Sequence, residues 1–162
     1  MNRRRVLITG ARVWPVTLTY LLNGVLDTEL LKADNGALTV VHGACPSGAD
    51  WFAHRWVAGQ SHGRGLAALE EPHPADWDHC DPTCNHRPIL RSGRPFCPQA
   101  GHRRNQKMVD LDADICHAFV VAGNSRGTMD CVGRARASDI LTIEHRVELP
   151  ELLPHSRDRV GR

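Results

Sequence analysis

The chain has 162 residues, of which 41% are hydrophobic and 23% are charged, and its formal net charge at pH 7 is only +2. These values are ordinary for one globular domain of about 100–200 residues, and they exclude a disordered chain. The small net charge does not by itself indicate a nucleic-acid partner, and no apolar stretch approaches the ~20 residues that span a membrane.

Short apolar runs alternate with amphipathic segments along the first half of the chain, which predicts a parallel sheet flanked by helices. In chain order we expect a strand over 5–9, a helix over about 16–31, a strand over 38–41, a helix over 49–57 and a weaker strand over 66–69. Pro72 and Pro74 then end the regular structure.

The second half continues this alternation after a loop rich in cysteine and histidine. We expect a helix from near 102 to 112, a strand over 115–121, a helix over 127–138 and a strand over 140–143. The run 115–121 is almost entirely apolar, as a central parallel strand should be. The pattern therefore predicts one α/β domain over residues 1–146, with a mostly parallel sheet of about five strands and a polar tail over 147–162.

Small, flexible residues follow three of these strands, at turns where parallel sheets bind ligands. The turns are TGAR at 9–12, GACPSGAD at 43–50 and GNSRGT at 123–128. Glycines there let a phosphate approach the backbone, although each turn alone is equally well explained as a tight βα connection. Three such turns together favour an anionic, nucleotide-like ligand. Neither the P-loop pattern nor a G-x-G-x-x-G after the first strand is present.

The segments VLITGARVW, VVHGACPSGAD, HPADW and AGHRRNQKMV, followed by GT before a helix, resemble the YspA-type branch of the SLOG superfamily. That superfamily groups Rossmann-like domains related to the DNA-processing protein DprA and to LOG-type phosphoribohydrolases. The resemblance runs from Arg5 to about Ile143. It implies a three-layer Rossmann-like domain that binds a nucleotide or a nucleotide-derived molecule, and a homodimer is a common arrangement in this superfamily.

The resemblance also implies which residues line the pocket. They are Gly10, Arg12, Gly43, Gly48, Asp50, Arg104, Asn105, Gly127 and Thr128. Enzymatic relatives carry G-G-x-G-T-x-x-E, whose glutamate takes part in cleaving an N-glycosidic bond. Cys131 stands at that position here, and the nearest carboxylate, Asp130, is rotated by about 100° if the segment is helical. We therefore expect a sensor-type binding protein, with a phosphoribohydrolase that uses Asp130 as the alternative.

Residues 79–100 look like an insertion whose side chains suit a metal. Three thiols and one imidazole come from Cys80, Cys84, His86 and Cys97. Tetrahedral zinc is held by such ligands, and a loop too polar to build its own core would gain order from the metal. We expect a structural zinc site that pins the loop so that Arg103, Arg104 and Asn105 enter the pocket in a fixed orientation. His79 and His102 are alternatives to His86 as the fourth ligand.

Three further predictions concern the cellular location of the protein, the state of its thiols and a nucleic-acid partner. Val6–Ile8 is too short for the apolar region of a signal peptide, so we expect a cytoplasmic protein with reduced thiols and no membrane association. A free, solvated loop is the alternative to zinc, and a disulfide comes third. A zinc-dependent nucleic-acid-binding protein is the least favoured function, because Phe96 is the loop's only aromatic residue. Its phosphate contacts would come from Arg87, Arg91, Arg94, Arg103 and Arg104.

Overall fold

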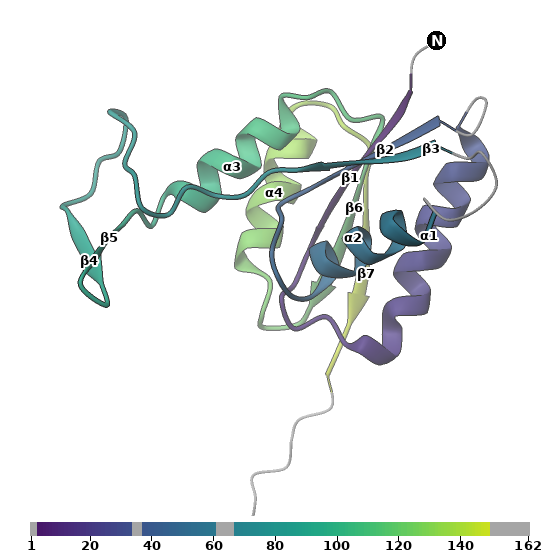
Figure 1. Ribbon diagram of the computed structural model, residues 1–162, viewed down its shortest axis with the longest axis horizontal. Coiled ribbons are helices and arrows are strands. Elements are labelled where there is room, and N and C mark those ends of the chain that lie inside the picture. Colours follow the sequence, from purple (N-terminus) through teal and green to yellow (C-terminus); the bar gives the residue numbers. More distant parts are fainter. Residues whose placement is uncertain (1–2, 34–36, 61–66, 150–162) are drawn as a thin grey trace, which may run out of the picture.

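The computed structural model describes residues 3–33, 37–60 and 67–149 (Figure 1). Five strands form one parallel sheet in the order β3-β2-β1-β6-β7. They are β1 (Arg4–Gly10), β2 (Ala37–His42), β3 (Ala67–Pro72), β6 (Ile115–Val121) and β7 (Thr142–Val147). This is the predicted α/β class, and the order is that of Rossmann-like folds. Leu66, the expected first residue of the third strand, lies outside the described residues.

Two pairs of helices cover the two faces of the sheet. The helices are α1 (Thr19–Lys32), α2 (Ala49–Gln60), α3 (Ala100–Val109) and α4 (Arg126–Ala137), and the short 3₁₀ turn η1 (Val16–Leu18) precedes α1. α1 and α2 pack on one face, while α3 and α4 pack on the other, which gives three layers (Figure 1). Within the described ranges, no helix is long and apolar enough to cross a membrane.

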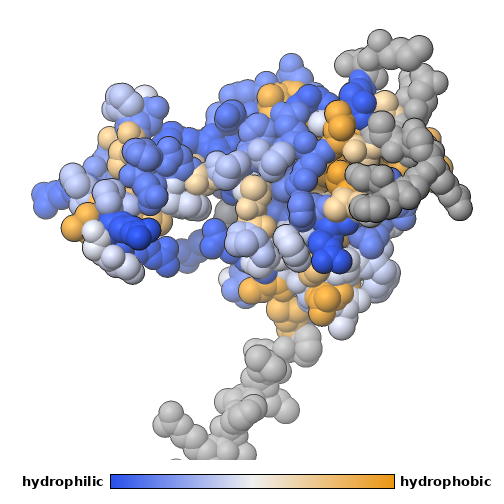
Figure 2. Space-filling view, in the orientation of Figure 1, coloured by the Kyte–Doolittle hydropathy of each residue, from blue (hydrophilic) through white to orange (hydrophobic). Residues whose placement is uncertain are grey.

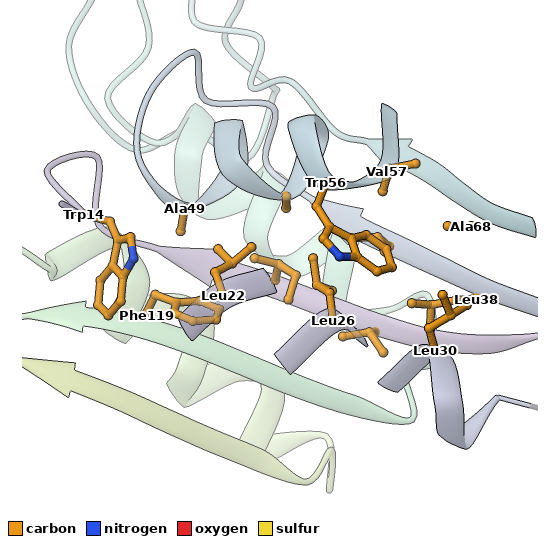
Figure 3. Packing of buried hydrophobic residues seen from close by; sticks show 14 of the residues in the cluster. Trp14, Leu22, Leu26, Leu30, Leu38, Ala49, Trp56, Val57, Ala68 and Phe119 are labelled. Carbon is orange, nitrogen blue, oxygen red and sulfur yellow. The ribbon is translucent and has the colours of Figure 1, made fainter. Parts of the chain in front are cut away.

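The three inner strands, β1, β2 and β6, each supply both hydrophobic cores, because successive side chains point to opposite faces. Val6 and Ile8 pack toward α1 and α2, whereas Leu7 packs toward α3 and α4. All seven residues of β6 are buried, as expected of a strand covered on both sides. At one end of the first core, Trp14 meets Phe119 edge to face with ring centroids 5.2 Å apart (Figure 3).

Several predicted boundaries differ from the observed ones, and two elements are displaced toward one end. The helix after the cysteine loop ends at Val109 rather than at residue 112, and Asp112 has a φ of 52°, which a helix does not contain. The last strand begins at Thr142 rather than at 140 and continues to Val147. β7 is an edge strand, so its partly exposed positions accept polar residues that hide the strand in the sequence. Residues 150–162 of the expected tail lie outside the described ranges.

The cysteine loop contains a small hairpin that the sequence pattern did not predict. β4 (Ile89–Arg91) and β5 (Arg94–Phe96) pair antiparallel across Ser92 and Gly93. Both turn residues have positive φ, 52° and 77°, as a two-residue type I′ turn requires. The hairpin projects from the body of the domain, at the left of Figure 1. The Ser-Gly pair between two short apolar runs is the signal that could have revealed it.

Candidate functional site

The four predicted metal ligands come together in the loop. One ligand atom from each of Cys80, Cys84, His86 and Cys97 lies within 4.8 Å of all the others. The Cys84 and Cys97 sulfurs are 3.6 Å apart, and His86 Nε2 lies 3.5 Å from the Cys97 sulfur. With metal bonds of about 2.0–2.3 Å, the corners of a tetrahedron are roughly 3.3–3.8 Å apart. The cluster therefore has the chemistry and the dimensions of a tetrahedral metal site.

Hydrogen bonds around the cluster orient two of its ligands. His86 Nδ1 donates to the Arg87 carbonyl at 2.7 Å, which leaves Nε2 free to bind a metal. Arg103 Nη1 donates to the sulfurs of Cys84 and Cys97 at 2.9 and 3.1 Å. Arg103 therefore contacts the thiols rather than entering the ligand pocket as predicted, and its position one turn into the helix that follows Cys97 is the signal that could have indicated this.

The thiols affect one another strongly. Burial raises the pKa of Cys80 to about 11, and the neighbouring thiols of Cys97 and Cys84 add to this increase. Burial also acts to raise the pKa of Cys97, but hydrogen bonds with Arg103 and His86 bring it down to about 6. The cluster thus accepts one thiolate readily and resists further negative charge. A bound divalent cation would relieve that repulsion.

The two alternative histidines are engaged elsewhere. His79 Nδ1 lies 2.8 Å from a carboxylate oxygen of Asp76, and His102 Nδ1 lies 2.9 Å from one of Asp130. Neither imidazole belongs to the cluster. His86 is therefore the histidine that completes the ligand set.

The base of the loop is closed by one hydrogen bond and by stacked rings. The Cys97 amide donates to the Trp77 carbonyl at 2.7 Å, so the two ends of the loop touch. The Trp77 and Phe96 rings stack with an interplanar angle of 5° and centroids 5.6 Å apart. Trp77 also packs against Gly101 in the first turn of α3. The Cys/His cluster is thereby attached directly to the start of α3.

A second group of residues meets at the carboxyl edge of the sheet around buried Asp50. Arg104 of α3 donates through Nη1 to the Gly43 carbonyl after β2 and, at 3.4 Å, to the His73 carbonyl after β3. A side chain at Gly43 would overlap the Arg104 guanidinium and come within 2.8 Å of Asp50 Oδ2. Gly43 therefore provides the space that Arg104 occupies.

Three other predicted pocket glycines have different surroundings. A side chain at Gly10 would overlap Ala49 at the start of α2, and one at Gly48 would overlap the backbone of residues 11 and 12. Gly48 also has a φ of 71°, which disfavours any other residue. Beside Gly127, in contrast, there is open space. Gly10 and Gly48 thus allow the turns after β1 and β2 to pack closely, whereas the space beside Gly127 stays accessible.

The charges around Asp50 come from several segments. Burial raises the pKa of Asp50, while the Cys45 amide, at 3.1 Å from Oδ2, and the charges of His42, Arg104 and Arg12 act to lower it. Two arginines distant in sequence thus face one buried carboxyl group. A second anion beside them would be well placed for charge-assisted hydrogen bonds.

The N-terminus of α4 borders the same region. Asn105 Nδ2 donates to the Gly127 carbonyl at 3.1 Å, which joins α3 to the first turn of α4. Ser125 occupies the N-cap position but makes no capping bond, since its hydroxyl is bonded to Val121 instead. Thr128 is buried in the same turn. The first amides of α4 are therefore left without a side-chain cap.

Asp130, the predicted acid of the alternative hydrolase, holds α3 and α4 together. It accepts hydrogen bonds of 2.9 Å from Asn105 and Arg134 and pairs with His102 at the same distance. Burial acts to raise the pKa of Asp130, but these three partners hold it below its usual value. The neighbouring thiol of Cys131 is buried, which raises its pKa to about 11. Asp130 is thus an ionised carboxylate whose oxygens are already engaged.

A groove lies between α3 and α4 on the outer side of these residues. It has a volume of about 410 Å³ and is lined by Gln99, His102, Arg103, Gln106 and Arg134. The groove borders both the metal cluster, through Arg103, and the Asp130 network, through His102 and Arg134. The helix that separates it from the sheet carries Arg104 and Asn105 on its inner side.

Comparison with known proteins identifies a relative in a phage. The Gene 61 protein of Mycobacterium phage D29 is 38% identical to this chain over 140 residues, which are 86% of this chain and 94% of the phage protein. No protein-family model matches the chain, and no solved structure matches it. The similarity therefore spans most of both chains.

Proposed function

The chain belongs to the family of the Gene 61 protein of Mycobacterium phage D29, whose name states no activity, and we therefore propose a function from the site itself. We propose that the protein binds a nucleotide or a nucleotide-derived molecule at the carboxyl edge of its sheet. We also propose that the Cys/His cluster holds a structural zinc ion. The motif resemblance to the YspA-type branch of the SLOG superfamily supports the first part.

The convergence of Arg12 and Arg104 on Asp50 carries the proposal, together with the bond from Asn105, the residue after Arg104, to the uncapped first turn of α4. Arg104 is supported by the Gly43 and His73 carbonyls, which accept from one edge of its guanidinium. A phosphate group would accept hydrogen bonds from the two arginines and from the first amides of α4, where the helix dipole favours negative charge. The open space beside Gly127 would admit it.

The ligand set supports zinc, and it supports a structural role for the metal. Three thiolates and one imidazole fill a tetrahedral shell, so no coordination position stays open for a reacting water molecule. Arg103 would then contact two metal-bound thiolates, while the next residue, Arg104, reaches the proposed ligand site. The metal would therefore fix the orientation of the first turns of α3.

The geometry of Asp130 does not favour the hydrolase. A general acid must carry a proton near the operating pH, whereas three donors keep this carboxylate ionised. We accordingly propose binding without turnover.

Native mass spectrometry of the freshly purified protein, with AMP added as a probe, tests both parts together. We expect the mass of one zinc per chain and an AMP adduct. Arg104→Met should keep the zinc but weaken AMP binding about 10- to 100-fold, because a charge-assisted hydrogen bond contributes about 1.5–3 kcal/mol. Cys84→Ser should lose the zinc.

Two controls make the result specific. Arg55→Met, at an exposed position of α2, should bind AMP as the wild type does. Arg12→Met removes the second arginine from a more exposed position, so weakened binding in this variant would not reflect a damaged core. A bare polypeptide mass would contradict both parts, and AMP bound equally by Arg104→Met would contradict the proposed location.

A further inference from the structure

The projecting hairpin lies in an unusually basic part of the chain. Between Asp81 and Asp110 the sequence contains no acidic residue. The hairpin and the residues before it carry Arg87, Arg91 and Arg94. None of these three guanidinium groups takes part in an ion pair among the described residues. Their positive charge is therefore available to a partner.

The pairing of the hairpin places two of these charges together. Arg91 and Arg94 are directly opposite each other, on either side of the two-residue turn. Like charges in such a pair destabilise a hairpin, so the arrangement costs stability that an anionic partner would restore. The Arg91 guanidinium also lies over the Phe96 ring, 5.2 Å from its centroid, which helps to fix its direction.

The hairpin projects from the domain, and contacts with Trp77 fix its base. The Trp77–Phe96 stack and the Cys97–Trp77 hydrogen bond hold the end of β5 beside the cluster, and Ile89 pairs with Phe96 at this base of the hairpin. Hydrophilic residues dominate this lobe in Figure 2, although apolar atoms also reach its surface. Leu90, which is 69% exposed, is one of the apolar residues of the hairpin. A charged tip with apolar side chains behind it is an interaction surface rather than a packed one.

We propose that this hairpin docks into the major groove of double-stranded DNA, with Arg91 and Arg94 contacting phosphates and base edges. A major groove about 12 Å wide admits a two-stranded ribbon, and arginine is the side chain best matched to phosphate and to guanine. Single-stranded nucleic acid fits less well, because Phe96 is already stacked on Trp77 and offers no free platform for a base. The sequence alone gave nucleic acid the lowest rank, and the hairpin supplies the specific contact surface that the sequence pattern did not show.

Fluorescence anisotropy of a short labelled duplex, titrated with the zinc-loaded full chain at several salt concentrations, tests this inference. For one phosphate contact each from Arg87, Arg91 and Arg94, the slope of log K against log salt should be about −3. Arg91→Gln and Arg94→Gln should each weaken binding and make that slope shallower by about one. Arg55→Gln removes an exposed arginine far from the hairpin in sequence and should change neither quantity.

Further measurements separate the possible outcomes. Each variant should retain its zinc in native mass spectrometry, so that weaker binding is not the result of a lost fold. Arg104→Met should bind the duplex normally, and excess AMP should not compete, because the nucleotide site is a different one. The inference is wrong if the wild type does not bind the duplex or if Arg55→Gln weakens binding equally. It is also wrong if a single strand binds more tightly, or if an acidic peptide such as polyglutamate competes as well as DNA does.

Discussion

His117 is a titratable side chain in the middle of the sheet. It is buried on β6, its Nδ1 lies 3.0 Å from Nε2 of His145 on β7, and its Nε2 lies 3.5 Å from Glu29 of α1. Burial lowers the pKa of His117 to about 4, and the neighbouring His145 adds to this decrease. Burial also lowers the pKa of His145. Both imidazoles are therefore neutral in the folded protein at neutral pH.

The buried histidine predicts how stability depends on pH. The pKa of His117 lies below its unfolded value of about 6.5, so between pH 6.5 and about 4 the unfolded chain binds more protons. The free energy of unfolding should accordingly fall as the pH decreases through this window. Urea denaturation of the wild type and of His117→Asn at several pH values checks this. The difference between the two proteins should shrink toward acid pH, while metal release affects both alike; parallel curves would contradict the assignment.

The metal ligands could be predicted from the sequence because they lie close together in it. Cys80, Cys84, His86 and Cys97 form a visible local pattern. The ion pair of His102 could not be predicted in this way, because its partner, Asp130, lies on another helix. The same holds for the contact of Arg104 with the Gly43 carbonyl, which joins residues far apart in the chain.

At the scale of elements, the close packing of α2 on the sheet depends on glycine. A side chain at Gly10 would overlap the Ala49 side chain and also lie 2.9 Å from Cβ of Phe119. Ala11 continues the contact, since its carbonyl accepts from the Ala49 amide at 3.4 Å. The first turn therefore determines how closely α2 can approach β1.

Two glycine substitutions should change stability in opposite directions. Gly10→Ala should destabilise the protein by about 1–3 kcal/mol, because an added methyl group overpacks a filled site. Gly133→Ala, in the exposed middle of α4 where nothing lies within 4 Å, should stabilise it by about 0.5–1 kcal/mol. Urea denaturation of both variants measures the two changes. If Gly10→Ala changed the free energy of unfolding by the same amount and in the same direction as Gly133→Ala, the turn after β1 would be able to relax around a side chain.

Buried elements were predicted more accurately from the sequence than exposed ones. β6 was predicted with its observed bounds, because a strand covered on both faces is apolar at every position. β7 and the hairpin were predicted poorly or not at all. The exposed positions of an edge strand accept polar residues, and two three-residue strands leave no periodicity to detect.

For the whole molecule, the loop and the sheet are stabilised separately. The hydrophobic clusters of the described residues include Ala68 and Met108 but no residue between them. The part of the chain that carries the thiols therefore depends on the metal cluster, the Trp77–Phe96 stack and a few hydrogen bonds. Loss of the Cys/His cluster should therefore not unfold the sheet and its hydrophobic cores.

Removal of the metal should consequently unfold the loop alone. After chelation, amides between about residues 77 and 99 should exchange with solvent much faster, while those of β1, β2 and β6 should stay protected. Hydrogen exchange with mass spectrometry, compared before and after zinc is restored, measures this directly. Protection lost throughout the sheet would mean that the metal stabilises the entire domain.

The hydrogen bond between the Cys97 amide and the Trp77 carbonyl has a consequence for how such proteins can diverge. Because the two ends of the loop already touch, the scaffold needs only a short bridge at this point, and lengthening the loop adds little closure entropy. Evolution can therefore exchange, enlarge or delete this segment without moving the sheet. Family members should differ here in length, and a laboratory graft should be tolerated at the same junction as readily as any natural insert.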